Sequence, residues 1–284
     1  MENRTYVQLG RRSDLGADCS SCFGLCCVAL AFVKSSDFPR DKPAGEPCDN
    51  LDEHDACRIH PQLRDQGFKG CTVFDCFGAG QKVSQQTFDG RSWRDDPKVR
   101  DEMFAVFPRV RRLHELLWYL DEAIALVQAH RDPSPWADAF ERVRELSDRP
   151  AQDLADLDVD AAYDSARGLL VEASEIARSG VEPGRRRRGA RTPGPGSDLI
   201  GAKLAGADLS GVTLRGSVAI AADLSDATMR SCDVLGVDLR DADLSGADLS
   251  DAIYLTQMQV NSARGDARTA LPEGFERPVH WTYG

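Results

Sequence analysis

Eight of the nine cysteines lie within the first 76 residues, and their spacing is that of metal ligands. Two thiolates at positions i and i+3 can reach one tetrahedral metal ion, which makes C-x2-C a common half-site. Eight thiolates could fill two four-thiolate zinc sites or hold an iron–sulfur cluster with thiols to spare. The sequence therefore predicts a zinc or iron centre whose candidate ligands are Cys19, Cys22, Cys26, Cys27, Cys48, Cys57, Cys71 and Cys76.

Several alternatives to this ligand set stay open. Cys26 and Cys27 are adjacent, so their side chains are expected to diverge and not to serve one metal ion in the same way. His54 and His60 lie between Cys48 and Cys71 and could replace some thiolates. Disulfides and simply buried, reduced thiols are the two non-metal interpretations, and a reducing compartment argues against the disulfides.

The segment CSSCFGLCC, followed by GEPCDNLDEHDACRIHPQLRDQGFKGCTVFDC, resembles a family of zinc- or iron-chelating proteins with a C-x2-C-x2-C-C signature. The resemblance covers residues 19–76 and implies the same eight cysteines as ligands. This chain departs from the signature by one residue, because three residues separate Cys22 from Cys26. The resemblance implies a metal domain without naming a reaction.

The composition is that of an acidic protein with several folded units. The chain has 284 residues, of which 42% are hydrophobic and 29% charged, and its formal net charge is -11. This charge does not favour direct binding to nucleic acid. The first residues, MENRTYVQLGRRSDLGADC, contain no signal-peptide core, and no stretch reaches the roughly 18–20 apolar residues of a membrane span. We therefore expect a cytoplasmic protein with no membrane partner.

The sequence predicts four segments. Residues 1–94 form a loop-rich cysteine domain, and residues 95–180 a helical unit packed on it, with Pro108 kinking or restarting the first helix. Residues 181–196 are an Arg-, Gly- and Pro-rich linker, in which Arg185 to Arg188 are either solvated or grip nucleic acid or an acidic partner. Residues 197–284 form a repeat domain with a C-terminal cap. The first helix is predicted from apolar residues three and four positions apart, at Val106, Val110, Leu113, Leu117, Leu120, Ile124 and Val127.

A period of five residues begins at Ser197 and continues for twelve pentads. In each pentad the first residue is small and the second is usually Asp. The third is apolar and, except for Ala219, large, as in Leu204, Leu244 and Leu249. This period fits neither a helix nor a strand, but it fits a coil that turns a corner every five residues. Four sides close one turn, so we expect three turns with paired backbones, with Cys232 in their core.

The pentads resemble the pentapeptide-repeat family, which implies a right-handed quadrilateral β-helix over residues 197–256. The predicted fold class is thus multi-domain, with a loop-rich, helix-containing cysteine domain followed by this β-helix. Some members of the family mimic DNA and protect gyrase. Residues 197–256 carry ten Asp against four Lys or Arg, which is the right sign for a DNA mimic, but three turns are too short for it.

Three functions follow from these patterns. The first is a metal-binding protein, with zinc or iron, whose repeat domain is a scaffold for a protein partner. The second is an iron-dependent oxidoreductase that uses the cysteine site, and the third is a DNA-mimicking, gyrase-binding protein. Neither a Ser-His-Asp order, a phosphate loop nor a dinucleotide fingerprint is visible, so hydrolase and NAD chemistry have no support. The sequence does not decide whether the protein is an enzyme.

Overall fold

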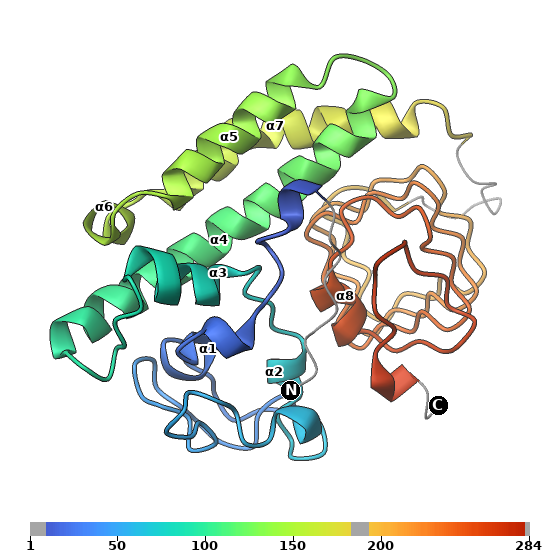
Figure 1. The fold of residues 1–284 in the computed structure, drawn as a ribbon. Helices are drawn as coiled ribbons and strands as arrows, with labels where there is room; N and C mark the ends of the chain where they lie inside the picture. Colours follow the sequence, from blue (N-terminus) through green and yellow to red (C-terminus); the bar gives the residue numbers. More distant parts are fainter. Residues whose placement is uncertain (1–9, 183–192, 282–284) are drawn as a thin grey trace. The chain divides into compact units, whose positions relative to one another are not determined.

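The computed structural model describes residues 10–182 and 193–281 (Figure 1). The chain divides into two compact units, residues 1–170 and 171–284. Most of the segment predicted as a linker, including Arg185 to Arg188, lies outside the described residues. The four-segment division made from composition stays a prediction.

Helices dominate the first unit, and α7 crosses from the first unit into the second. The α-helices are α1 (Leu25–Val28), α2 (Lys69–Thr72), α3 (Ala79–Gln81), α4 (Pro97–Gln128), α5 (Ser134–Ser147), α6 (Ala151–Ala155), α7 (Val159–Arg178) and α8 (Gln257–Ser262). Single 3-10 turns lie at Gly10–Arg12, Cys19–Ser21, His60–Gln62 and Val279–Trp281, and a π-helical turn follows α3 at Lys82–Thr87.

Helix α4 organises the first unit. Asp96 caps its start by accepting the Lys98 backbone N–H at 2.8 Å, and Pro97 occupies the first position, where no N–H is needed. The predicted restart at Pro108 does not occur, since α4 is continuous from Pro97 to Gln128, whereas the alternative of a kink there stays a prediction. Val106, Phe107 and Val110 around the proline are fully buried, and their burial offsets the one backbone hydrogen bond that proline removes.

The helix α4 contacts α1, α3, α5 and α6, so it lies between the cysteine region on one side and α5 on the other (Figure 1). Its apolar face carries buried residues at the spacing that the sequence predicted, from Val106 to Val127. His114 lies on the same buried face and is wholly enclosed. Its Nδ1 atom lies 2.7 Å from the Phe77 carbonyl oxygen, which ties the cysteine region to the helix.

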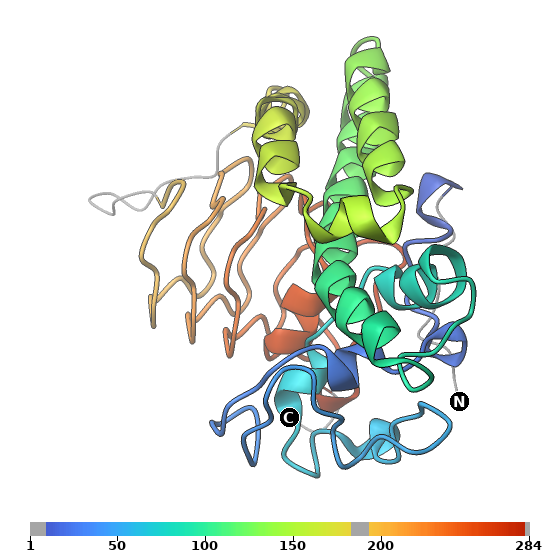
Figure 2. The ribbon, with the colours of Figure 1, turned by 90° about the vertical axis from the view of Figure 1, so that its left-hand side faces the viewer.

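The second unit is a stack of square turns. Isolated parallel bridges join residues twenty positions apart, such as Asp198 to Val218 and Val218 to Asp238, so that four pentads make one turn. Figure 1 shows the turns as nested loops, and Figure 2 shows them stacked side by side. The third residues of the pentads point inward, and Leu244 and Leu249 are fully buried. Cys232 is also fully buried in this apolar core.

The predicted right-handed quadrilateral β-helix is wrong. The described part of the chain contains no β-strand and no sheet, and the bridges between turns of the repeat are isolated single-residue bridges. The physical reason is the short period. A corner every five residues leaves one bridging residue per side, flanked by turn residues, so that no run long enough for a strand forms.

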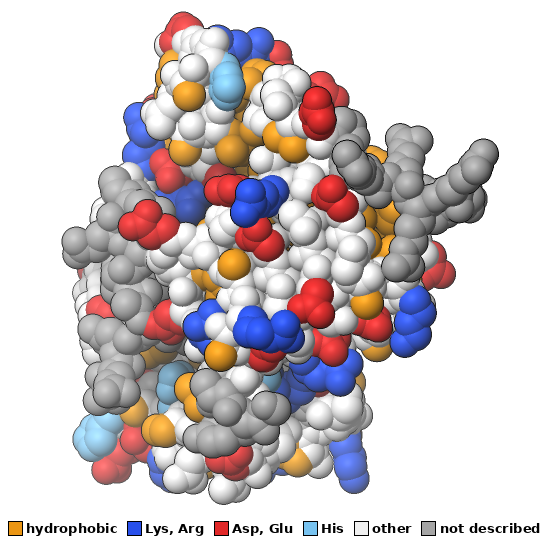
Figure 3. Space-filling view, turned by 90° about the vertical axis from the view of Figure 1, so that its right-hand side faces the viewer, with side chains coloured by type: hydrophobic (Ala, Val, Ile, Leu, Met, Phe, Trp, Pro, Cys, Tyr) orange, Lys and Arg blue, Asp and Glu red, His pale blue; other side chains and the backbone are white. Residues whose placement is uncertain are grey.

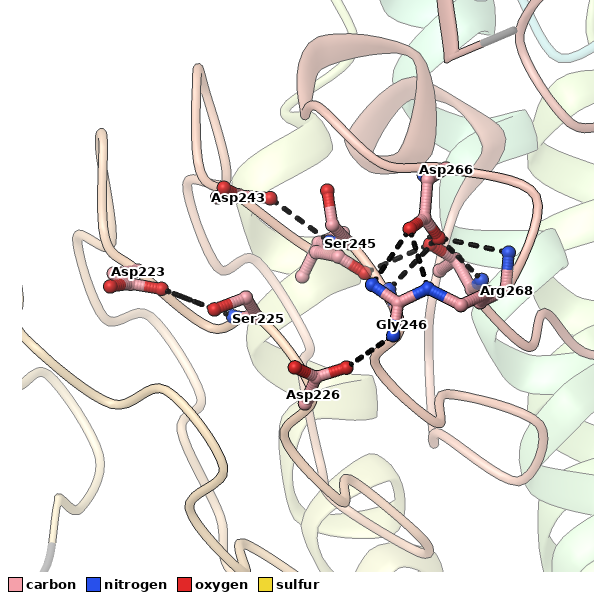
Figure 4. Close-up of polar contacts among 10 residues, drawn as sticks. Asp223, Ser225, Asp226, Asp243, Ser245, Gly246, Asp266 and Arg268 are labelled. Carbon is pink, nitrogen blue, oxygen red and sulfur yellow. Dashed lines mark hydrogen bonds and ion pairs between the residues drawn. The ribbon is translucent and has the colours of Figure 1, made fainter. Parts of the chain in front are cut away.

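The Asp at the second pentad position has a local role that periodicity alone does not predict. Its carboxylate accepts the backbone N–H of the residue two positions later, in the manner of an Asx-turn. Figure 4 shows the pairs of Asp223 with Ser225 and of Asp243 with Ser245. The same bond is made by Asp198, Asp208, Asp233, Asp238 and Asp248. The acidity of the repeat therefore follows largely from how each corner is built.

The end of the chain covers the last turn of the repeat. A capping box between Thr256 and Gln259 starts α8, and the Gln259 amide nitrogen donates to the Val234 and Val237 carbonyls at 2.9 Å each. Trp281 is buried, and its indole nitrogen donates to the Ala263 carbonyl at 3.0 Å. These contacts satisfy backbone groups that an open end would expose.

No helix in the described ranges has both the length and the apolar character needed to cross a bilayer.

Candidate metal centre

The run CSSCFGLCC folds as two short turns. Cys19–Ser21 is a 3-10 turn that Asp18 caps by accepting the Ser20 N–H at 3.0 Å. The helix α1 carries Cys26 and Cys27. Gly24 precedes it with φ of 65°, and a Cβ there would meet the Leu51 side chain at 2.7 Å. Only glycine suits this corner, which reverses the chain between Cys22 and Cys26.

The helix α3 brings two distant cysteines to one place. A Cβ added to Gly80 would lie 2.7 Å from the Cys22 Sγ and 3.8 Å from the Cys76 Sγ. The absence of a side chain at Gly80 therefore makes room for both sulfur atoms. The neighbouring π-helical turn also binds the cysteine segment, because the Ser84 hydroxyl accepts the Phe23 backbone N–H at 3.0 Å.

A second group of thiols gathers around α1. The sulfur atoms of Cys26 and Cys27 lie 3.9 Å apart, so that these adjacent side chains do not diverge as expected. The Cys48 backbone N–H donates to the Cys27 carbonyl at 2.9 Å, and the Cys57 side chain hydrogen-bonds to that of Cys27. Segments that lie far apart in the sequence thus meet around Cys27.

The two groups differ in their electrostatics. Burial raises the pKa of Cys22 to about 12, with the thiols of Cys26 and Cys19 acting in the same direction. Burial also raises the pKa of Cys76. In the other group, the hydrogen bond with Cys27 lowers the pKa of Cys57 to about 6, whereas hydrogen bonds with Cys26 and Cys57 raise the pKa of Cys27. The two thiols therefore shift each other's pKa in opposite directions.

The remaining predicted ligands lie elsewhere along the cysteine region. Cys71 lies in α2. His54 is exposed and faces Glu53 at 3.6 Å, and His60 opens a 3-10 turn. All nine cysteines carry thiols, and Cys232 belongs to the core of the other unit. The ligand set itself stays a prediction.

The donor chemistry suits a thiophilic metal ion, but the thiols of the described residues do not converge on one point. Over the described ranges, no three His, Cys, Asp or Glu side chains are placed so that they could hold a metal ion. Cys26 acts on the pKa of both Cys22 and Cys27, so it lies near both groups of thiols. A four-thiolate site would require these two groups to move closer together.

Sequence reasoning missed two residues of this region. Gly80 makes room for Cys22 and Cys76, and the only available signal was its neighbour Gly78, since paired glycines often mark close backbone approach. Lys42 is buried near Cys27 and Cys48, although lysine is seldom buried. No sequence pattern marks it, because burial depends on contacts with distant segments.

A family model for pentapeptide repeats matches eight copies, over residues 196–234 and 222–253. In addition, the chain is 49% identical over 268 residues to the Uncharacterized protein YybG of Bacillus subtilis strain 168. This match covers 94% of the chain and 95% of YybG. The chain is a pentapeptide-repeat protein of the YybG family. The family-model match does not extend to residues 19–76, so the resemblance of this pentapeptide-repeat protein's cysteine region to metal-chelating proteins stays a prediction.

Proposed function

We propose that this pentapeptide-repeat protein is a scaffold whose repeat unit binds a protein partner. The supporting observation is an apolar patch on one side of the repeat. Ile200 is 60% exposed and Val218 is 37% exposed. They lie on adjacent turns, because Val218 bridges to Asp198, and Ile220 continues the same column, because its carbonyl accepts the Gly201 N–H.

This patch stands out from its surroundings. The described residues include only four exposed large hydrophobic side chains, and two of them are Ile200 and Val218. On the face in Figure 3, acidic and basic side chains are interspersed instead of being sorted by sign. A grouped apolar patch with a polar rim is the usual mark of a protein-binding site.

The DNA-mimicking, gyrase-binding alternative draws less support. Seven Asp side chains of the repeat accept hydrogen bonds from their own pentads, so a structural role accounts for them. Arg268 also bridges Asp226 and Asp266, as Figure 4 shows, which reduces the acidic character of one corner.

Photo-crosslinking tests the scaffold proposal. A photoreactive phenylalanine at position 200 should give a discrete adduct with another protein in cells of the source organism. The matched control places the same residue at Ser210, which lies on a different side of the coil and is half-buried. Equal adducts from both positions, or none from position 200, would contradict the proposal.

We further propose that the cysteine region binds zinc or iron through thiolates. The supporting observation is that cysteines of different segments interact with one another around α1 and α3. A metal ion would then draw the two groups together and contribute to folding, since thiolate ligation stabilises small loop-rich domains. The residues that would hold it come from the eight-cysteine set, with Cys22, Cys26, Cys27 and Cys57 the best placed.

Elemental analysis of anaerobically purified protein tests this second proposal. The parent protein should contain zinc or iron, and Cys22→Ala should lower the metal content. Cys232→Ala is the control and should leave the metal content unchanged, because Cys232 lies in the repeat core. A folded parent without metal and with eight reactive thiols would overturn the proposal. Colourless zinc would favour a structural centre, whereas coloured iron with an open position would favour the oxidoreductase.

A further inference from the structure

Asp233 is a buried carboxylate on one side of the repeat. It occupies the second position of its pentad, where the other Asp side chains are exposed or half-buried. In the described ranges it is the one carboxylate that is fully buried. Its Oδ1 atom accepts the Leu235 N–H at 3.0 Å, as in the other corners of the coil. Its Oδ2 atom is therefore available to groups outside this corner.

Three donors meet at this Oδ2 atom. The Ser174 hydroxyl donates to it at 2.7 Å, the Thr213 hydroxyl lies at 3.3 Å and the Arg215 Nη2 at 3.2 Å. Thr213 and Arg215 lie on the same side of the coil as Asp233, because Thr213 bridges to Asp233. Ser174 comes from α7 instead and is fully buried. The carboxylate therefore joins α7 to the coil.

A second contact lies one helical turn further along α7. The Arg178 Nε donates to the Ser174 hydroxyl at 3.0 Å, and its Nη1 donates to the Gly211 carbonyl at 3.2 Å. Beyond the helix, Val181 packs at this corner too, because a Cβ at Gly211 would lie 3.3 Å from its side chain. All these residues belong to the second unit. The end of α7 thus lies along one side of the coil.

This contact is polar and only partly satisfied. Arg215 pairs with the buried Asp233, and the attraction within such a pair is largely offset by the hydration that both groups lose. The Arg215 Nε is buried and has no hydrogen-bond partner among the described residues, which is a further cost. Detachment of α7 would hydrate both side chains and leave the bridges between the turns in place. We therefore expect α7 to detach more readily than the coil unfolds.

We propose that residues 171–181 are a strap that closes one side of the repeat, and that Asp233 is its latch. The strap opens while the coil stays folded. The closed strap keeps this side of the coil from a protein partner, whereas the open strap exposes the Thr213 hydroxyl, the Arg215 guanidinium and the Asp233 carboxylate to a polar segment of a partner. The strap does not depend on the exposed apolar patch of the repeat, so the two proposals can fail separately.

Hydrogen–deuterium exchange of the full-length protein, read by mass spectrometry, tests the strap. Asp233→Asn keeps an acceptor for the Leu235 N–H but removes the charge that holds Ser174. A hydrogen bond to a charged group is stronger than one to a neutral group, so amide exchange in residues 171–178 should rise about 10- to 100-fold. Ser174→Ala removes the donor without weakening the helix and should raise the exchange as well.

Asp243→Asn is the matched control, because Asp243 has the same pentad position on another side of the coil. Its carboxylate accepts the Ser245 N–H at 3.0 Å, as Figure 4 shows. This variant should leave exchange in residues 171–178 within about twofold of the parent. Equal effects of Asp233→Asn and Asp243→Asn, or none from Asp233→Asn, would overturn the latch. Circular dichroism checks that each variant folds.

Exchange in the parent protein covers the case in which Asp233→Asn does not fold. Amides of residues 171–178 should exchange through an opening that urea hardly promotes, since detachment exposes little surface. The Leu224 and Leu244 amides bond to the next turn of the coil and should exchange only when the repeat unfolds, with a steep dependence on urea. The same urea dependence in both sets of amides would overturn the strap.

Discussion

In the repeat unit, bridged residues lie twenty positions apart from Asp198 to Ile253, as in the bridge from Asp223 to Asp243. In the cysteine region, Phe23 bonds to Ser84, 61 positions away, and Trp93 bonds to Phe23, 70 positions away. Each turn of the repeat can thus form by pairing with the turn that directly precedes it in the sequence. The cysteine region depends instead on many long-range contacts being made together, which cost more chain entropy before they stabilise anything.

This difference bears on the proposed functions. A periodic coil places surface residues in straight columns. Bridges between adjacent turns recur every five residues and fix the register, so the coil suits a rigid binding face. The cysteine region has no repeating support, and its thiols come from separate segments. Such a region is a place where a bound metal ion would add the most stability.

The largest effect should come from breaking the repeat core. Leu244→Asp places a charge without a partner in the fully buried stack and should destabilise the repeat unit by about 4 kcal/mol. Ser245→Asn changes the next residue, which is half-buried on the outer side, and should be nearly neutral. Urea unfolding of both variants measures the difference. Similar losses from both would show that the inward register is wrong.

A smaller loss is expected in the cysteine region from Gly80→Ala. The new methyl group would lie 2.7 Å from the Cys22 sulfur, so the first unit should lose about 1–3 kcal/mol. Gly168→Ala is the matched control on the exposed face of α7, with no atom within 4 Å of the new group. It should stabilise the helix by about 0.5–1 kcal/mol. Thermal unfolding of the two variants should give shifts of opposite sign.

The two units should also differ in their response to acid. Burial lowers the pKa of His114 from 6.5 to about 4, with the imidazole neutral between Phe77 and Ser147. Since the unfolded chain protonates first, the first unit loses stability as the pH falls from 6.5 towards 4, by about 1.4 kcal/mol at pH near 5.5. His114→Gln should remove this slope.

The repeat unit should keep its stability as the pH falls from 6.5 towards 4. Hydrogen bonds from Ser225, Arg240 and Ser250 lower the pKa of Asp223, Asp238 and Asp248 below the ordinary 3.8. Their contribution is complete above that value and is lost only as the pH falls through the lowered pKa. Tryptophan fluorescence follows mainly the first unit, which holds Trp93, Trp118 and Trp136. If the repeat unit unfolds at a higher pH than the one at which the fluorescence of these tryptophans changes, the predicted difference in acid stability between the two units is wrong.

The sequence by itself determined the features that depend on periodic burial. The spacing from Val106 to Val127 predicted the buried face of α4, and the pentads predicted which residues of the repeat point inward. Both predictions succeed because, in a regular backbone, residues at a fixed spacing lie on the same face. The prediction of a β-helix was wrong, because each side of the repeat holds one bridging residue and no strand forms in the described residues.

Only the tertiary structure decided how the cysteines divide. Their spacing predicted thiol pairs, but it could not place Cys22 beside Cys76 across Gly80, or Cys57 beside Cys27. Nor could it show that Lys42 is buried near these thiols. These neighbours are set by loops of irregular length folded against α4, and irregular loops carry no period from which spatial proximity can be read.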